Sequence, residues 1–522
     1  AIGKDALSVN TTGNKNIAIG KDALEASNAS GNTAIGHDAM KANTTGVQNV
    51  AVGAYALDAN TTANNNVAVG HDALTANTTG QSNTCIGSDA GQAITTTSNN
   101  TVVGSQAYIE GTGNENTCIG SYCGYNLTTG NYNTAIGYQA LYTEDAGTQL
   151  IALGRHALYS NDGGTQNTAL GYSALYANTS GDSNTATGYF ALGSNTTGGN
   201  NTAYGRDSLY NNTTASNNTA VGHYAIRENT TGYSNTAVGA NALDACTTGG
   251  ENVAIGHNAM TDSTTGGACT AVGHQAAANL TTAGYAVAIG HNAMGSANVT
   301  GDNNCAVGRN SLYGCTTGNH NTAVGGSATL YGLSTGSYNT AMGVDAGQNI
   351  STGSNTTLIG YQAGTSGGAG GILVTESNRI VLGNNAVTNF TAQVALSVAS
   401  DERDKTDITD FTKGLDIVNS LRPVTYRWDH RTNYDNGIPD GTHKESKLNI
   451  GLIAQEVETV EKANGYATSN DDSLFIHKST DGENYCLTYE KLIPVLINAV
   501  KELSAKNDAL ETAIKNAGIS TS

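Results

Sequence analysis

Residues 133–137 read Asn133-Thr-Ala-Ile-Gly137, and nearly the same five residues recur as Asn167-Thr-Ala-Leu-Gly171 and Asn218-Thr-Ala-Val-Gly222. The closing glycine occurs 22 times, and 17 of the 21 spacings between successive copies are 17 residues. These glycines stand at positions 3, 20, 36, 53, 70, 87, 104, 120, 137, 154, 171, 188, 205, 222, 239, 256, 273, 290, 308, 325, 343 and 360. A unit reads N-T-A-(I/V)-G-x-x-A-L-x-x-N-T-T-G-x-x. A period held over so many copies indicates a solenoid of stacked coils.

The repeats account for an unusual composition. The 522-residue chain has 66 glycines, 3 prolines and only 12% charged residues, whereas ordinary domains have roughly 25%. Large apolar side chains are too few for cores of normal size, and the regular apolar pattern argues against disorder. The net charge of -19 argues against nucleic acid as a partner. No run of about 18 apolar residues exists to span a membrane.

Each unit predicts one coil of a mainly β, parallel β-solenoid or β-roll of about 22 coils. We expect two short strands per coil, at T-A-I-G and x-A-L, and a turn at N-T-T-G. The fixed glycine suggests a tight bend with positive φ, and the repeated asparagines can stack into amide ladders. With about 4.8 Å per coil, the rod is roughly 100 Å long. Because so thin a coil buries little, we expect several chains to pack side by side.

The composition divides the chain before Ser400. Residues 1–399 hold 30 charged residues, whereas residues 400–522 hold 35, together with all three prolines and Trp428. We therefore predict a repeat shaft at 1–365, a connector at 366–399 with strands at 379–383 and 392–398, and a small α+β domain at 400–522 that ends in a helix at 488–518. The chain begins partway through a repeat, and we interpret it as a piece of a longer protein.

Residues 399–408 read Ala399-Ser-Asp-Glu-Arg-Asp-Lys-Thr-Asp-Ile408. Three further blocks follow in order, Leu421-Arg-Pro-Val-Thr-Tyr-Arg-Trp428, Gly451-Leu-Ile-Ala-Gln-Glu-Val-Glu458 and Tyr489-Glu-Lys-Leu-Ile-Pro-Val-Leu496. This region resembles the intramolecular chaperone autoprocessing domain that ends phage endosialidases, tail spikes and tail fibres. The repeats in turn are similar to the β-roll heads of trimeric autotransporter adhesins and to repeat-built phage fibres.

The resemblance implies a single-turnover serine peptidase that cuts its own chain between Ala399 and Ser400, with no turnover on external substrates. Ser400 would be the nucleophile and Lys405 the general base, since a serine hydroxyl needs a base to attack. Asp401 and Arg403 match the motif and are expected to position this pair. The alternative is a capped turn at Ser-Asp-x-Arg with Lys405 as a solvated charge, or a retained fold without cleavage.

The end of the chain predicts a coiled coil. Its seam follows alternating steps of four and three residues, at Leu492, Leu496, Ala499, Leu503, Lys506, Leu510, Ala513 and Ala517. A single amphipathic helix packed on its own domain is the alternative. The resemblance implies a homotrimer, in which the last domain aligns three repetitive chains and cleaves itself once folding is complete.

Other recurring residues suggest weaker sites. His257, His274 and His291 follow the repeat glycine in three consecutive coils; a metal site is one interpretation, and a solvated histidine row is preferred. Tyrosines that follow the repeat leucine, at 142, 159, 176, 210 and 313, form a stripe that could bind sugar or simply pack between coils. The eight cysteines show no CxxC pair, so we expect filler residues and no zinc. No cofactor is expected.

These observations favour a structural and adhesive fibre. We expect a phage or virus tail fibre or tail spike, located outside the cell on the virion, with a host-surface receptor as partner, for which a polysaccharide is a candidate. A trimeric adhesin on a bacterial cell surface that carries the same chaperone is the alternative. An ice-binding or surface-binding solenoid is a weaker one.

Overall fold

The structure is a computed structural model that describes residues 1–296, 298–365, 372–384, 386–387, 390–391, 393, 400–431, 434, 437–469, 472–478 and 485–518. By the density of their internal contacts, the residues form two compact units, Ala1–Asn339 and Thr340–Ser522. Each unit is described by itself.

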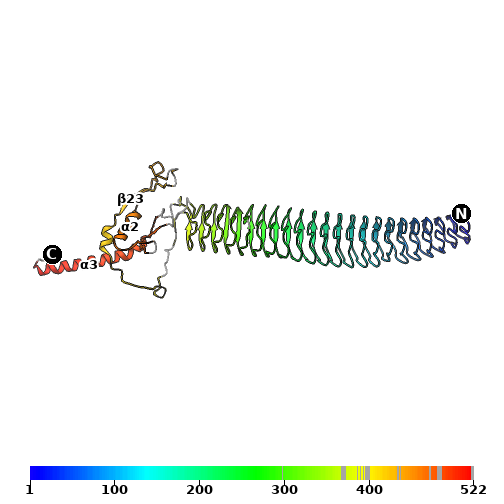
Figure 1. Ribbon diagram of the computed structural model, residues 1–522, viewed down its shortest axis with the longest axis horizontal. Helices are drawn as coiled ribbons and strands as arrows, with labels where there is room; N and C mark the ends of the chain where they lie inside the picture. The colour runs from blue at the N-terminus through cyan, green and yellow to red at the C-terminus, as the bar shows by residue number, and fades with distance from the viewer. Residues whose placement is uncertain are drawn as a thin grey trace. The chain divides into compact units, whose positions relative to one another are not determined.

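The first unit is a stack of coils, each of which contributes one strand to a parallel sheet (Figure 1). Its strands are β1 (Ile17–Ile19), β2 (Thr33–Ile35), β3 (Val50–Val52), β4 (Val67–Val69), β5 (Thr84–Ile86), β6 (Thr101–Val103), β7 (Thr117–Ile119), β8 (Thr134–Ile136), β9 (Ile151–Leu153), β10 (Thr168–Leu170), β11 (Thr185–Thr187), β12 (Thr202–Tyr204), β13 (Thr219–Val221), β14 (Thr236–Val238), β15 (Val253–Ile255), β16 (Thr270–Val272), β17 (Val287–Ile289), β18 (Cys305–Arg309) and β19 (Thr322–Ser327). Consecutive strands pair in register, as in Thr202↔Thr219. The predicted fold class, a parallel β-solenoid with a 17-residue period, is confirmed.

The prediction of a second strand at x-A-L is wrong. In that segment the backbone alternates in sign of φ, and the leucine itself has positive φ, for example 55° at Leu57 and 52° at Leu175. A strand requires negative φ throughout, so this segment is a series of turns. It still bonds to the next coil, because the Leu57 N–H donates to the Ala73 carbonyl over 3.0 Å.

In most coils the repeat glycine directly follows the strand, at a place where only glycine fits. Gly137 has a φ of 138°, and a Cβ atom built on it would lie 2.5 Å from the carbonyl oxygen of Gly154 in the next coil. Positive φ in this range is open to glycine alone. The predicted tight bend is therefore present, and the close approach of successive coils explains why the glycine recurs.

A single chain encloses its own core, contrary to the expectation that one coil would bury little. In the coil that starts at β3, Ala51, Ala56, Leu57 and Asn60 are completely buried. The predicted asparagine ladders run through this core: Asn60 Nδ2 donates to Asn43 Oδ1 over 2.7 Å. A second ladder precedes the strands, where the backbone N–H of each asparagine donates to the side chain one coil before. Amide pairing thus replaces the missing bulk of apolar side chains.

In one coil that is a residue shorter than most, a tyrosine hydroxyl takes the place of an asparagine in the amide ladder. The spacing from Gly104 to Gly120 is 16 residues, and Tyr108 takes the place of the usual leucine. Its buried hydroxyl accepts from the Gly113 N–H over 2.9 Å and from Asn116 Nδ2 over 2.8 Å. The phenol therefore fills the position that the missing turn asparagine occupies in other coils.

The second unit begins with three more parallel strands, β20 (Thr340–Met342), β21 (Thr357–Ile359) and β22 (Ile380–Leu382). The strand predicted at 379–383 is thus another coil strand that pairs with β21, rather than part of a separate connector. The strand predicted at 392–398 lies outside the described residues, apart from Gln393.

The rest of the second unit is α+β, as predicted. It contains the 3-10 turn η1 (Glu402–Asp404), α1 (Leu415–Ser420), β23 (Val424–Tyr426), β24 (Asn449–Gly451), α2 (Ala454–Ala463), β25 (Ile476–Lys478), β26 (Tyr485–Leu487), η3 (Tyr489–Lys491) and α3 (Leu492–Asn516). Its core joins Ile417, Val457, Phe475, Ile476 and Val495. None of the helices in the described part of the chain has the length and hydropathy that a membrane span requires.

Candidate active site

The Ser400 and Lys405 side chains meet across η1. Asp401 caps this turn, because its Oδ1 accepts from the Arg403 N–H over 2.9 Å. The turn brings Lys405 back over Ser400, so that Lys405 Nζ lies 2.6 Å from Ser400 Oγ and 3.3 Å from the Ser400 carbonyl oxygen. The two side chains are within hydrogen-bonding distance of each other, as a nucleophile and its base must be.

Asp401 and Arg403 stabilise the turn that joins the pair. The Arg403 guanidinium donates to both Asp401 oxygens, from Nε over 3.0 Å and from Nη2 over 2.6 Å. These bonds hold the pKa of the Asp401 carboxyl below its usual range and raise that of Arg403. Within the described residues neither side chain is hydrogen-bonded to Ser400 Oγ, and their positioning role stays a prediction.

In the single chain this site is open to solvent. Ser400 and every residue from Asp401 to Asp410 are exposed, and the chain reaches the domain core only at Phe411. Ala399, the other half of the predicted scissile bond, lies outside the described residues. The arrangement supplies a serine nucleophile beside an amine, while a lysine acts as a base only when desolvation or nearby positive charge favours its neutral form.

The three downstream sequence blocks contact one another. Arg422, in the first block, donates from Nε to Glu456 Oε2 over 3.1 Å, on α2 in the second block. The Leu452 N–H of the second block donates to the Tyr489 hydroxyl of the third over 3.0 Å. The three blocks, which follow one another in the sequence, therefore pack together in one unit.

Two buried glutamates of α2 were not singled out from the sequence. Glu461 is 1% exposed and accepts from the N–H groups of Leu474 and Phe475 over 2.7 and 2.6 Å. Glu458 pairs with Lys462 and Lys478, and these bonds lower the pKa of its carboxyl. Glu461 thus fixes α2 to the segment before β25, and Glu458 fixes it to Lys478 at the end of β25. The signal was weak, because two carboxylates on a short helix usually belong to a solvated face.

The predicted coiled-coil seam divides between two environments. Ala499 is 6% exposed, and Leu492 packs against the core of its own domain. Leu496, Leu503 and Leu510 are instead 50%, 59% and 58% exposed. The first turns of α3 therefore pack on their own domain, and the face formed by the three exposed leucines is uncovered in the single chain.

The remaining candidates form local clusters on the shaft. His257, His274 and His291 stack with ring centroids 5.3 and 5.2 Å apart, and all three are exposed. His71, Asp72 and Asp89 bring ligand atoms within 4.8 Å of one another, which would suit a divalent cation. All eight cysteines are free thiols, and several fill core positions of the coil, as expected.

The described geometry defines a β-solenoid protein whose second unit carries a Ser–Lys pair ahead of a small α+β domain. Residues 400–466 match the family of the chaperone of endosialidase. The combination fits a tail fibre with an endosialidase-type chaperone domain, and the family implies a self-cleaving, serine-peptidase-like domain. Comparison with curated proteins and with solved structures found no match.

Proposed function

We propose that this chain is a structural and adhesive fibre of a phage or virus tail, whose last domain trimerises three chains, assists their folding and then cuts itself off between Ala399 and Ser400. The observation that carries the proposal is the 2.6 Å contact between Lys405 Nζ and Ser400 Oγ, within the segment that matches the chaperone family.

The cleavage proceeds in two steps. Lys405 Nζ removes the proton of Ser400 as Oγ attacks the Ala399 carbonyl carbon, and the C–N bond breaks as the Ser400 nitrogen takes up a proton. The product is an ester between Ala399 and Ser400 Oγ. Water then hydrolyses this ester, which leaves a carboxylate on Ala399, a free amine on Ser400 and the Ser400 hydroxyl restored. The enzyme therefore acts once.

Assembly explains how an exposed lysine becomes a base. In one chain Lys405 is open to water, whereas a lysine acts as a base when its surroundings exclude water. A neighbouring chain that covers the site would exclude this water, so cleavage would follow assembly. This order protects the fibre, because repeats can slip by one whole coil until the last domain has aligned the three chains.

Two uncovered apolar surfaces support self-association. Leu496, Leu503 and Leu510 project from α3 at coiled-coil spacing. On the shaft, the last residue of many strands is a half-exposed Ile, Val or Leu, for example Ile136 at 37% and Leu170 at 47%. This stripe repeats once per coil, and another copy of the chain has the same period. An apolar stripe of this length is typical of an interface.

The fibre would lie outside the cell on the virion and contact a receptor on the host surface. The alternative, a trimeric adhesin on a bacterial surface that carries the same chaperone, rests on the same physical argument. The two differ in the sequence expected before Ala1, which is a signal peptide for the adhesin and a virion-attachment domain for the tail fibre. An ice-binding solenoid would show freezing hysteresis, and we expect none for this chain.

The test couples assembly to cleavage. Leu503→Glu/Leu510→Glu places charges on the uncovered face of α3, whereas Ala505→Glu/Thr512→Glu adds the same charge to other exposed positions of that helix. We expect the solution mass of three chains and complete cleavage for the wild type and the control, and uncut monomer for the leucine variant. A monomeric wild type would contradict trimerisation, and full cleavage of a monomeric leucine variant would contradict the coupling.

A further inference from the structure

Aromatic side chains gather on one part of the shaft. Around β8–β10 they form a surface that we call the tyrosine patch, made of Tyr138, Tyr142, Arg155, Tyr159, Tyr172 and Tyr176. Tyr142, Tyr159 and Tyr176 stack in successive coils with ring centroids 5.1 Å apart and planes within 10° of parallel. The stacked contacts continue from Tyr142 to Tyr125 and from Tyr172 to Tyr189. The aromatic surface is still confined to part of the shaft, since the residue after the repeat glycine is a serine at Ser105 and an alanine at Ala240.

The stack determines which atoms the patch offers to a partner. Tyr159 has a ring on each face, from Tyr142 and from Tyr176, and His156 meets it in a T-shaped contact with ring centroids 5.4 Å apart. The ring faces of this row are therefore closed to a partner, and the patch offers one phenol hydroxyl per coil at the repeat of the stack. Tyr138 and Tyr172 lie beside this row and are 43% and 38% exposed.

Arg155 gives the patch a positive charge. Its guanidinium carbon lies 5.6 Å from the Tyr138 ring centroid and 5.7 Å from that of Tyr172, and within the described residues it forms no ion pair. Arg206, in contrast, is paired with Asp207. In a chain of net charge -19, a free arginine held between two rings is an anion-binding group.

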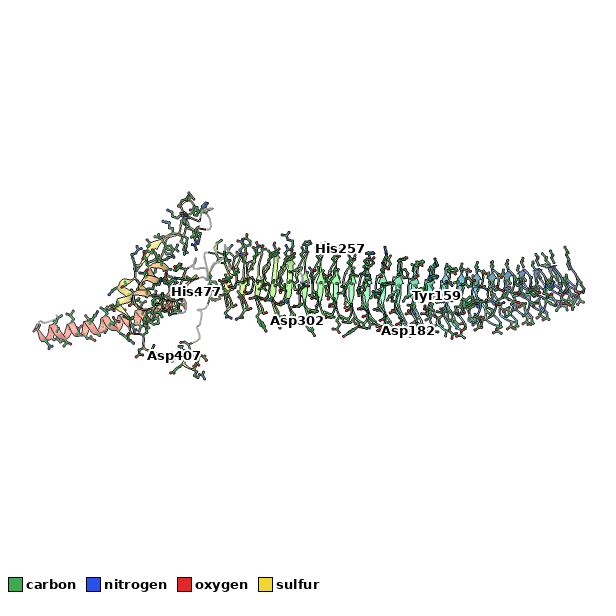
Figure 2. All side chains as sticks on the ribbon, viewed as in Figure 1. Tyr159, Asp182, His257, Asp302, Asp407 and His477 are labelled. Atoms are coloured by element: carbon green, nitrogen blue, oxygen red, sulfur yellow. The ribbon has the colours of Figure 1, made fainter. Side chains whose placement is uncertain are left out.

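The acidic turns lie on another side of the coil. Figure 2 shows His257, which directly follows a repeat glycine, at the edge of the shaft opposite Asp182 and Asp302. Arg155 also directly follows a repeat glycine, and within the described residues no carboxylate pairs with it, so an anionic partner can reach its charge.

We propose that the tyrosine patch binds a linear acidic polysaccharide, laid along the shaft axis with carboxylates at Arg155 and sugar hydroxyls at the tyrosine hydroxyls. The periodicity favours this class of partner, because one sugar ring spans about the distance between neighbouring tyrosines. An extended peptide instead presents side chains to one face every ~6.6 Å, twice the rise of a strand. The inference deepens the adhesive role proposed above and rests on it.

A second copy of the chain is a poorer occupant. Self-association of two equal shafts requires a surface that repeats along their whole length, as the apolar strand stripe does. The tyrosine patch covers a few coils, so the bound partner is short or is a polymer of which a short run is held.

The test measures binding of the full-length chain to hyaluronan, alginate and chondroitin sulfate, with neutral dextran and poly-glutamate as comparison polymers. Arg155→Gln, which keeps the stack, is expected to weaken binding of at least one acidic polysaccharide about tenfold. Arg309→Gln follows a repeat glycine too and should leave binding unchanged. Tyr142→Ala/Tyr159→Ala should also lose binding, whereas Tyr313→Ala/Tyr331→Ala removes a similar stack elsewhere, with centroids 5.0 Å apart, and should not.

Failure of all three acidic polysaccharides to bind would overturn the inference, as would equal losses in the two arginine variants. Binding of poly-glutamate alone would indicate charge without sugar recognition and would also overturn it. Cleavage and solution mass are recorded on the same samples, so a trimeric, cleaved fibre that binds no sugar removes this inference alone. A chain that binds sugar but neither assembles nor cleaves removes the proposed fibre function instead.

Discussion

Lys405 Nζ and Ser400 Oγ lie 2.6 Å apart because the capped turn η1 reverses the direction of the chain between these two residues. The contact is local, so it requires neither the domain core nor the shaft. In the proposed function, assembly of the chains would exclude water from this pair. The pair would then be complete in each chain but inactive before assembly.

The turn makes cleavage sensitive to Asp401. Asp401→Ala removes both the cap and the bond to Arg403 and should slow the appearance of fragments at least tenfold. Asp401→Asn keeps a capping oxygen and should recover part of the rate. Glu402→Ala, in the same turn, should cleave at the normal rate. Equal rates for Asp401→Ala and the wild type would show that the turn does not position the pair.

The repeat glycine predicts a large cost for a single methyl group. Gly205 has a φ of 138°, and a Cβ atom there would lie 2.4 Å from the Gly222 carbonyl oxygen. Gly205→Ala should destabilise the shaft by more than the roughly 1–3 kcal/mol of backbone strain alone. Gly284→Ala, whose Cβ atom would meet nothing closer than 3.5 Å, should be nearly neutral. Thermal unfolding followed by circular dichroism measures both, and similar unfolding temperatures for the two variants would refute the close-approach argument.

The short coil predicts that the stability of the shaft depends on the hydroxyl of Tyr108. Tyr108→Phe leaves the Gly113 N–H without this buried acceptor, at a cost of roughly 1–3 kcal/mol, while Asn116 Nδ2 keeps its bond to the Gly130 carbonyl. Tyr313→Phe removes a hydroxyl from a stacked tyrosine elsewhere on the shaft and should change stability by less than about 0.5 kcal/mol. Chemical denaturation compares them. No loss of stability in Tyr108→Phe would mean that the hydroxyl does not replace the ladder asparagine.

Glu458 predicts a pH dependence of the last domain. Bonds to Lys462 and then to Lys478 lower the pKa of its carboxyl, so its stabilisation is present above the ordinary glutamate pKa of about 4.3 and is lost as pH falls through the lower, folded value. Glu458→Gln should therefore lower the urea midpoint at pH 7, and the difference should shrink as pH falls below about 4.3 and vanish once the pH is below the folded pKa. Trp428 fluorescence reports the transition. The exposed Glu511→Gln serves as control, and a difference that does not shrink between pH 7 and pH 3 would contradict the assignment.

The sequence predicted the solenoid because glycine recurs at a fixed interval. At positions such as Gly137 the next coil comes so close that no residue with a side chain fits, so the glycines mark the repeat. It did not predict the turns at x-A-L, since leucine rarely adopts the positive φ that Leu57 has, and here the stacking of coils overrides the local preference. β22 was placed in a connector because 23 residues, not 17, separate Gly360 from Gly383.

The candidate site was predictable in part. The resemblance pointed to Ser400 and Lys405, and their contact is what the structure adds. Ala499 could not be assigned from the heptad pattern, because a small residue at a seam position suits a neighbouring chain and its own domain equally. Glu461 gave no signal, since its role depends on backbone N–H groups of a segment thirteen residues further along the chain.

The most direct test of self-cleavage is denaturing electrophoresis with intact mass measurement of the full-length wild type, Ser400→Ala, Lys405→Met and the control Lys413→Met. We predict two fragments, residues 1–399 and 400–522 with Ser400 as the new amino terminus, for the wild type and Lys413→Met. The other two variants should each give one intact chain. An uncut wild type, or fragments from Ser400→Ala, would contradict the account.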